Sequence, residues 1–229
     1  MTFKLPPLPL SGPHHGPASG AAPDSIVLLL HGLGANGDDL IGLAPIFANV
    51  MPSTLFLSPN APQRFPAAPP GWPAFQWFPL NTFSQEEREE GTLAAAPILA
   101  GYIDAVIAGT GLPASKVALV GFSQGTMISL YVAPRRAEQL AAVVGYSGAL
   151  IHGAALKAER QSNPPVLLVH GDADPVVPVA ALPDAVAGLE AAGLSVQHHT
   201  RPGLQHGIDE EGIRLAALFL RKHLLGLSD

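Results

Sequence analysis

Ser123 stands at the centre of a five-residue segment, GFSQG at residues 121–125, that can present a serine as a nucleophile. The pattern G-x-S-x-G is typical of a sharp turn between a strand and a helix, which exposes the serine hydroxyl above a sheet edge. The pattern alone is weak evidence, because glycine and serine are common. However, residues 117–120 read as an apolar strand and residues 127–131 have helical character. We therefore expect Ser123 to be the nucleophile of an acyl-transfer reaction.

A serine becomes a good nucleophile only when a base takes its proton and a third group orients that base. Where the serine occupies such a turn, an acid and then a histidine follow it along the chain. Asp172 and Asp174 both lie on the loop after the expected strand 166–170. Asp172 directly follows a glycine, where local hydrogen bonds would hold the turn. Asp174 lies further out and can reach a neighbouring loop, so we favour it as the acid.

His206 occupies the position expected of the base, after the last expected strand at 194–200 and before the last expected helix at 209–225. The other histidines fit this position less well. They lie before the acid (His14, His15, His31, His152, His170), inside a strand (His198, His199) or near the end of a helix (His223).

Two backbone N–H groups are expected to stabilise the oxyanion that forms during acyl transfer. One is that of Gln124, directly after the nucleophile, and the other comes from a loop after an early strand. That loop, residues 31–37, reads HGLGANG, and Leu33 between two glycines is the expected donor. The same glycines match G-x-G-x-x-G, so an NAD(P)-binding oxidoreductase is the alternative. It is disfavoured because the following strand ends without the acidic residue that this motif needs.

Short apolar segments alternate with longer amphipathic ones along most of the chain, which predicts an α/β domain with a mostly parallel sheet. The N-terminal residues 1–25 are rich in proline, glycine and alanine, and we expect an irregular arm packed on the domain, with a possible short edge strand. A single domain is predicted over residues 26–229. The expected strands are 26–31, 54–58, 116–122, 141–146, 166–170 and 194–200, and the expected helices are 38–50, 91–109, 124–134, 178–192 and 209–225.

Residues 59–91 interrupt the alternation with a proline-rich stretch that also contains both tryptophans and four phenylalanines. Irregular connections of this length are uncommon in compact domains and are often functional. We expect Trp77, with Phe75 and Phe78, to line an apolar acyl pocket, although Trp77 as an ordinary core residue is an equal alternative. Val177, just past Asp174, is a further candidate for the pocket wall.

Composition excludes several classes of protein. The 229 residues carry a formal net charge of −6, which argues against binding nucleic acid, and 48% are hydrophobic, which argues against disorder. With no cysteine, disulfides, thiolate metal sites and cysteine nucleophiles are excluded. The start of the chain lacks the apolar run of a secretory signal, so we expect a cytoplasmic protein without stable membrane insertion. Assembly as a monomer or a homodimer is left open.

The motifs around Leu33, Ser123, Asp174 and His206, together with PNAP at residues 59–62, recur in one order that resembles the phospholipase/carboxylesterase family of α/β-hydrolases. The resemblance covers about residues 10–225. It implies an α/β-hydrolase fold with helices on both faces of the sheet and no large cap domain. It further implies the triad and the oxyanion donors named above, and no cofactor. Short-chain esters, lysophospholipids and acyl thioesters remain open as substrates, as does a non-catalytic scaffold.

Two positions depart from the family pattern. Thr126 stands where the family usually has a second glycine after the serine turn, and a larger residue there should alter the packing behind the nucleophile. The family also tends to carry Trp-x-Asp in the long loop, whereas here Pro79 follows Trp77 and Phe78. Both departures concern the shape of the acyl pocket.

Overall fold

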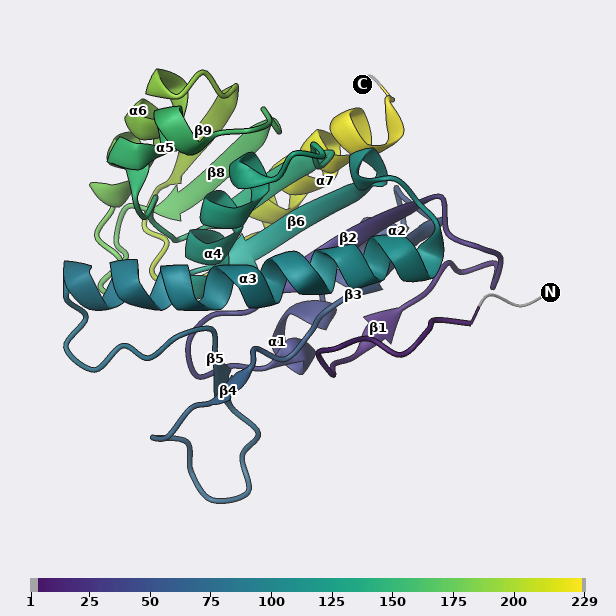
Figure 1. The fold of residues 1–229 in the computed structure, drawn as a ribbon, viewed down its shortest axis with the longest axis horizontal. Coiled ribbons are helices and arrows are strands. Elements are labelled where there is room, and N and C mark those ends of the chain that lie inside the picture. The colour runs from purple at the N-terminus through teal and green to yellow at the C-terminus, as the bar shows by residue number, and fades with distance from the viewer. Residues whose placement is uncertain (1–3, 228–229) are drawn as a thin grey trace.

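A seven-stranded sheet forms the centre of the computed structural model, which describes residues 4–227. The strand order is β1-β3-β2-β6-β7-β8-β9, and every neighbouring pair is parallel except β1 and β3 (Figure 1). A small antiparallel pair, β4 and β5, lies apart from this sheet. The strands are β1 (His14–His15), β2 (Ser25–Leu30), β3 (Thr54–Leu57), β4 (Gln63–Arg64), β5 (Phe75–Gln76), β6 (Val117–Phe122), β7 (Ala142–Tyr146), β8 (Val166–Gly171) and β9 (Val196–Arg201).

Helices cover both faces of the sheet and enclose two separate apolar cores. One core contains residues of α3, α4, α5 and α6, and the other contains residues of α1, α2 and α7. The α-helices are α1 (Gly37–Ile41), α2 (Ala44–Ala48), α3 (Gln85–Thr110), α4 (Gln124–Val132), α5 (Gly153–Glu159), α6 (Ala181–Ala191) and α7 (Glu210–Leu225), with short 3-10 turns at Ala114–Lys116 and Ala133–Arg135. The predicted α/β fold class is confirmed.

The central strand β2 shows why the sheet must be covered twice. Its six residues are all fully buried. Successive side chains of a strand point to opposite faces, so Ile26 and Leu28 enter the core under α3 and α4, while Val27 and Leu29 enter the core under α7. A strand with apolar side chains on both of its faces is stable only when both faces are covered.

Several predicted boundaries are wrong for local reasons. The helix expected over 38–50 is two short helices, α1 and α2, with Gly42 as the C-cap of the first and Pro45 in the first turn of the second. The helix expected over 91–109 begins at Gln85, because Ser84 caps it and accepts a hydrogen bond from the N–H of Glu87. Helix α5 was not expected at all.

Helix α3 is the longest in the described part of the chain and runs across one face of the sheet (Figure 1). By length and composition alone it could cross a membrane, but a core helix passes the same test and one such helix is weak evidence. Leu99, Ile103 and Val106 are fully buried against the sheet. One side of the helix is therefore part of the domain core.

Part of the proline-rich arm joins the sheet as an edge strand. His14 and His15 pair with Leu57 and Phe56 of β3, which makes β1 the antiparallel edge strand. A side chain on Gly12 would overlap the carbonyl oxygen of Ser58, so the arm approaches β3 closely at this point. The division into an arm, residues 1–25, and a domain, residues 26–229, stays a prediction.

Candidate active site

The turn between β6 and α4 holds Ser123 in a strained conformation, with φ +53° and ψ −113°. Side chains on the two flanking glycines would collide with backbone: Gly121 with Gly125, and Gly125 with the carbonyl oxygen of Leu30. The N–H of Ser123 donates to the carbonyl oxygen of Tyr146, 2.9 Å away, which ties the turn to β7. Strain of this kind is maintained only where the surrounding structure fixes it, and it concentrates at functional sites.

Asp174 and His206 come from the loops after β8 and β9 and meet through a hydrogen bond. His206 Nδ1 lies 2.7 Å from Asp174 Oδ2, and the other carboxylate oxygen accepts the N–H groups of Val176 (2.8 Å) and Val177 (2.9 Å). Burial opposes ionisation of the carboxyl group. The hydrogen bonds from His206, Val177 and Val176 outweigh it, and the pKa of Asp174 lies below its usual value. The carboxylate can thus orient the imidazole and stabilise its protonated form.

Neighbouring polar groups show how this carboxylate is placed. Asp172 is exposed and its Oδ1 accepts the N–H of Gly203, 2.6 Å away, so it links its loop to the loop after β9 instead of holding its own turn as expected. His170 is buried at the end of β8, with Nε2 2.9 Å from the carbonyl oxygen of Val177 and 3.4 Å from Asp174 Oδ2. It therefore supports the loop that presents Asp174.

Ser123 and His206 both line a cavity of about 290 Å³. Both expected oxyanion donors, Leu33 and Gln124, line it as well. Gln124 is the first residue of α4, and the N–H of a first helical residue has no partner within its helix. Within residues 4–227, no protein group accepts the N–H of Leu33. The remaining lining residues are mostly apolar: Gly32, Ala35, Leu80, Phe83, Arg88, Phe122, Met127, Val176 and Val177. An apolar cavity with a few convergent polar groups suits a small organic substrate.

The structure does not place the three aromatic side chains expected in the pocket along this cavity. Trp77 is fully buried in the core, with no solvent-accessible surface, and Phe78 is 1% accessible. Phe75 packs against the core from β5, and its N–H donates to the carbonyl oxygen of Ala35. The expectation that these residues form the wall is therefore corrected, whereas Val177 does line the cavity.

The Gln124 side chain explains why Trp77 and Phe78 are buried. Its Oε1 accepts the N–H of Trp77 (2.8 Å) and its Nε2 donates to the carbonyl oxygen of Phe78 (2.7 Å). The indole N–H of Trp77 in turn donates to the carbonyl oxygen of His31, 3.0 Å away. Gln124 thus fixes the aromatic loop, which we define as residues 59–84, against the nucleophile turn.

Leu80 and Phe83 of the aromatic loop line the cavity instead, and neither was predicted. One carboxylate oxygen of Glu87 accepts the N–H groups of Asn81, Thr82 and Phe83 at 2.8–3.0 Å. Ser84 followed three residues later by Glu87 is the sequence signature of a capping box. This signal would have placed the start of α3 at Gln85 and drawn attention to the residues just before it.

Thr126 fits behind the nucleophile because its neighbours leave room for it. The hydroxyl lies 2.8 Å from the carbonyl oxygens of both Gly121 and Tyr146. A side chain on Gly145 or Gly148 would overlap the Thr126 side chain. The larger residue is therefore accommodated by glycines on β7 and on the loop after it.

The glycines of the G-x-G-x-x-G segment contact backbone atoms of other segments of the chain. The N–H of Gly34 donates to the carbonyl oxygen of Phe75, and a side chain on Gly37 would overlap the carbonyl oxygen of Ser58. The helix that follows, α1, has only five residues. The preceding His31 is buried, which lowers its pKa, and its Nε2 accepts the N–H of Ala61. These glycines serve close internal packing around the cavity.

Comparison with known proteins gives consistent results. The model of the Phospholipase/Carboxylesterase family matches residues 18–224. An acyl-protein thioesterase 1 of Schizosaccharomyces pombe is 31% identical over 81% of this chain and 84% of its own length. Among solved structures, esterase PE8 has a TM-score of 0.89 and 40% identity, with 94% of this chain and 99% of that chain covered. Acyl-protein thioesterase 2 of Zea mays has a TM-score of 0.74 and 26% identity, with 93% of this chain and 100% of that chain covered.

The family match spans most of the chain, and the esterase and acyl-protein thioesterase structures share its fold. The chain belongs to the phospholipase/carboxylesterase family of α/β-hydrolases and is an ester hydrolase.

Proposed function

We propose that Ser123, Asp174 and His206 form the catalytic triad, and that the N–H groups of Leu33 and Gln124 form the oxyanion hole. The observation that carries the proposal is the 2.7 Å hydrogen bond between His206 Nδ1 and Asp174 Oδ2, beside the strained Ser123 in one cavity. The three side chains come from three different strand ends. Parallel strands bring their carboxyl ends to one sheet edge, where α/β proteins bind ligands.

The reaction proceeds in two steps through an acyl-enzyme. His206 takes the proton of Ser123 as the oxygen attacks the carbonyl carbon, while the Asp174 carboxylate stabilises the imidazolium. The alcohol or thiol leaves with that proton. Water then attacks the acyl-enzyme with His206 again as the base, and the carboxylic acid is released. Each oxyanion donor is worth about 10²–10³ in rate in comparable sites.

Replacement of Ser123 by alanine tests the triad. We expect S123A to lose turnover of p-nitrophenyl acetate to within the rate of the uncatalysed reaction. A fluorophosphonate probe should label the wild-type chain at Ser123 and leave S123A unlabelled. Turnover retained by S123A would overturn the triad, and absence of labelling in a folded, wild-type protein would favour a non-catalytic scaffold.

The substrate range is proposed to include short to medium carboxylic esters and acyl thioesters. Relatives named acyl-protein thioesterase and carboxylesterase support both classes. The cavity is small and apolar, which favours an acyl chain of modest length. A series of p-nitrophenyl esters of increasing chain length, with one acyl thioester of matched acyl group, would define the preference. A maximum at C4–C8 is expected, and activity only on the longest chains would contradict the proposal.

We also propose that the protein acts in the cytoplasm as a monomer or a homodimer and binds no nucleic acid. The net charge of −6 supports the last point, because a nucleic-acid-binding face should be basic.

A further inference from the structure

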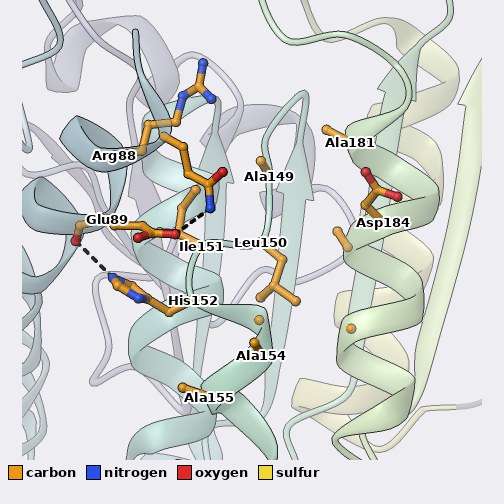
Figure 2. A pocket seen from close by; sticks show the side chains of 14 residues that line it. Arg88, Glu89, Ala149, Leu150, Ile151, His152, Ala154, Ala155, Ala181 and Asp184 are labelled. Atoms are coloured by element: carbon orange, nitrogen blue, oxygen red, sulfur yellow. Dashed lines mark hydrogen bonds between the residues drawn. The ribbon is translucent and has the colours of Figure 1, made fainter.

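A second cavity, of about 580 Å³, adjoins the Ser123 cavity and plays no part in the proposed chemistry. It lies between the first turns of α3, the segment that leads into α5, and α6. Figure 2 shows Arg88 and Glu89 of α3 on one side and Asp184 of α6 on the other, with Leu150 and His152 between them. The cavity is therefore bordered by charged groups from two separate helices.

Arg88 is the residue that joins the two cavities, because it lines both of them. It is half-buried in the first turns of α3. In Figure 2 its side chain extends away from His152, whereas the Glu89 side chain lies on the His152 side. Within the Ser123 cavity it is the only lysine or arginine among the lining residues. A substrate that extends from the Ser123 cavity into the second cavity therefore lies beside this guanidinium.

The positive charge of Arg88 has no partner within residues 4–227. No carboxylate lies within ion-pair distance of it, and no hydrogen bond from its guanidinium is formed to another residue. Both neighbouring carboxylates are occupied elsewhere. Glu87 accepts three backbone N–H groups, and Glu89 accepts the side-chain amide of Gln85 at 2.8 Å. The guanidinium therefore stays available to a ligand.

A guanidinium beside an apolar cavity favours an anion. Leu33, Leu80 and Met127 reduce the local polarity around the path from Ser123, and charge interactions strengthen where water is scarce. The planar fork of arginine matches carboxylate and phosphate groups with two parallel hydrogen bonds. A neutral acyl chain would form no ion pair or charge-assisted hydrogen bond with this guanidinium.

We propose that Arg88 is a specificity-determining residue of this ester hydrolase. It binds a carboxylate or phosphate on the part of the substrate that extends from the Ser123 cavity toward the second cavity. The proposal rests on the proposed role of Ser123, since the ester must be held at that oxygen. The preferred substrates are then esters or thioesters that carry an anionic group on the acyl chain or on the leaving group.

Two pairs of substrates distinguish an anionic group on the acyl chain from one on the leaving group. The acyl-side pair is p-nitrophenyl hydrogen glutarate and its neutral methyl ester, which have the same scissile bond. The leaving-group pair is 4-carboxyphenyl butyrate and its neutral methyl ester. For each pair the ratio of kcat/KM, anionic over neutral, is measured in the wild type, R88Q, R88K and R221Q, with thermal unfolding as a check of folding. Arg221 lies on α7, on the opposite face of the sheet, so R221Q removes the same charge remotely.

In R88Q the ratio should fall about tenfold for one pair, mainly through KM, since a charge-assisted hydrogen bond is lost. R88K should retain an intermediate ratio, because it keeps the charge without the fork. R221Q should keep the wild-type ratio. A fall confined to the glutarate pair places the anion on the acyl side, and a fall confined to the butyrate pair places it on the leaving group. Equal ratios in the wild type and R88Q for both pairs would overturn the proposal, as would an equal fall in R221Q. The triad assignment is tested separately by S123A.

Discussion

Two regions border the Ser123 cavity and are positioned by different means. The catalytic loops, which follow β6, β8 and β9 and carry Ser123, Asp174 and His206, begin where hydrogen-bonded strands end. The aromatic loop, residues 59–84, contributes only the short strands β4 and β5 and is held by side chains that reach in from elsewhere. The sheet thus positions the residues proposed for catalysis, and individual polar side chains hold the aromatic loop that borders the cavity.

The difference teaches that the two regions should respond differently to substitution. A change in the catalytic loops should reduce turnover while the fold is retained. A change in the contacts that hold the aromatic loop should lower stability and alter the cavity together. The following experiments test this separation, in order of decreasing expected effect.

The largest effect is expected for Asp174. D174N keeps the size of the side chain but loses the charge and allows the wrong tautomer of His206. We expect kcat to fall by about 10⁴, as in other triads, with a small change in unfolding temperature. D172N is the matched control from the same loop, and its kcat should stay within a few-fold of wild type. A comparable loss in both variants would mean that loop geometry, and not the Asp174 carboxylate, is responsible.

The next effect is expected for the side chain of Gln124. Q124A leaves the backbone N–H proposed for the oxyanion hole in place. It removes the hydrogen-bond partners of the buried N–H of Trp77 and of the carbonyl oxygen of Phe78. Each unsatisfied buried group costs about 1–3 kcal/mol, so the free energy of unfolding in urea should fall by about 2–6 kcal/mol. Q139A removes an exposed amide that accepts the N–H of Asn163, and it should cost far less. Equal losses would show that Gln124 does not anchor the aromatic loop.

A smaller effect is expected for Thr126. T126V keeps the volume that Gly145 and Gly148 accommodate, but it loses the hydroxyl, whose single proton is donated to the nearby carbonyl oxygens of Gly121 and Tyr146. The free energy of unfolding should fall by about 1 kcal/mol. T126S, which keeps the hydroxyl and loses one methyl group, measures the packing contribution separately. Wild-type stability in T126V would show that the hydrogen bonds contribute nothing.

The smallest effect is expected for Glu87 and depends on pH. Hydrogen bonds from backbone N–H groups, that of Thr82 above all, lower the pKa of Glu87. A carboxyl group whose pKa is lower in the folded state adds stability above its unfolded pKa, about 4.3, and this stability disappears as the pH falls through the folded pKa. The wild type should therefore unfold at a higher temperature than E87Q at pH 7, and the gap should close in acid.

E86Q is the control for this comparison, because the Glu86 carboxylate lies next in sequence on the same first turn but holds no loop N–H. At pH 7, E86Q should unfold closer to the wild type than E87Q does. A gap between wild type and E87Q that stays constant as the pH falls into the acid range would contradict a role for the ionised carboxylate in holding residues 81–83.

The site residues that follow strands were predictable because their spacing reflects the sheet. Ser123 lies in a turn with its own sequence signature, and the order of Asp174 and His206 follows from parallel strands that end at one edge. The wall residues were not predictable in this way. Trp77 and Phe78 look like pocket residues by type, yet their backbone groups pair with Gln124 and their rings complete the core.

The sequence by itself determined the α/β class, the family and the set of residues proposed for catalysis, because local patterns and their order along the chain carry that information. Only the tertiary structure decided which side chains line the cavity, how Thr126 is accommodated and that Arg88, between two cavities, has no ion-pair partner within the described residues 4–227. These properties depend on contacts between segments far apart in the chain, such as residues 77 and 124, and no local periodicity encodes such contacts.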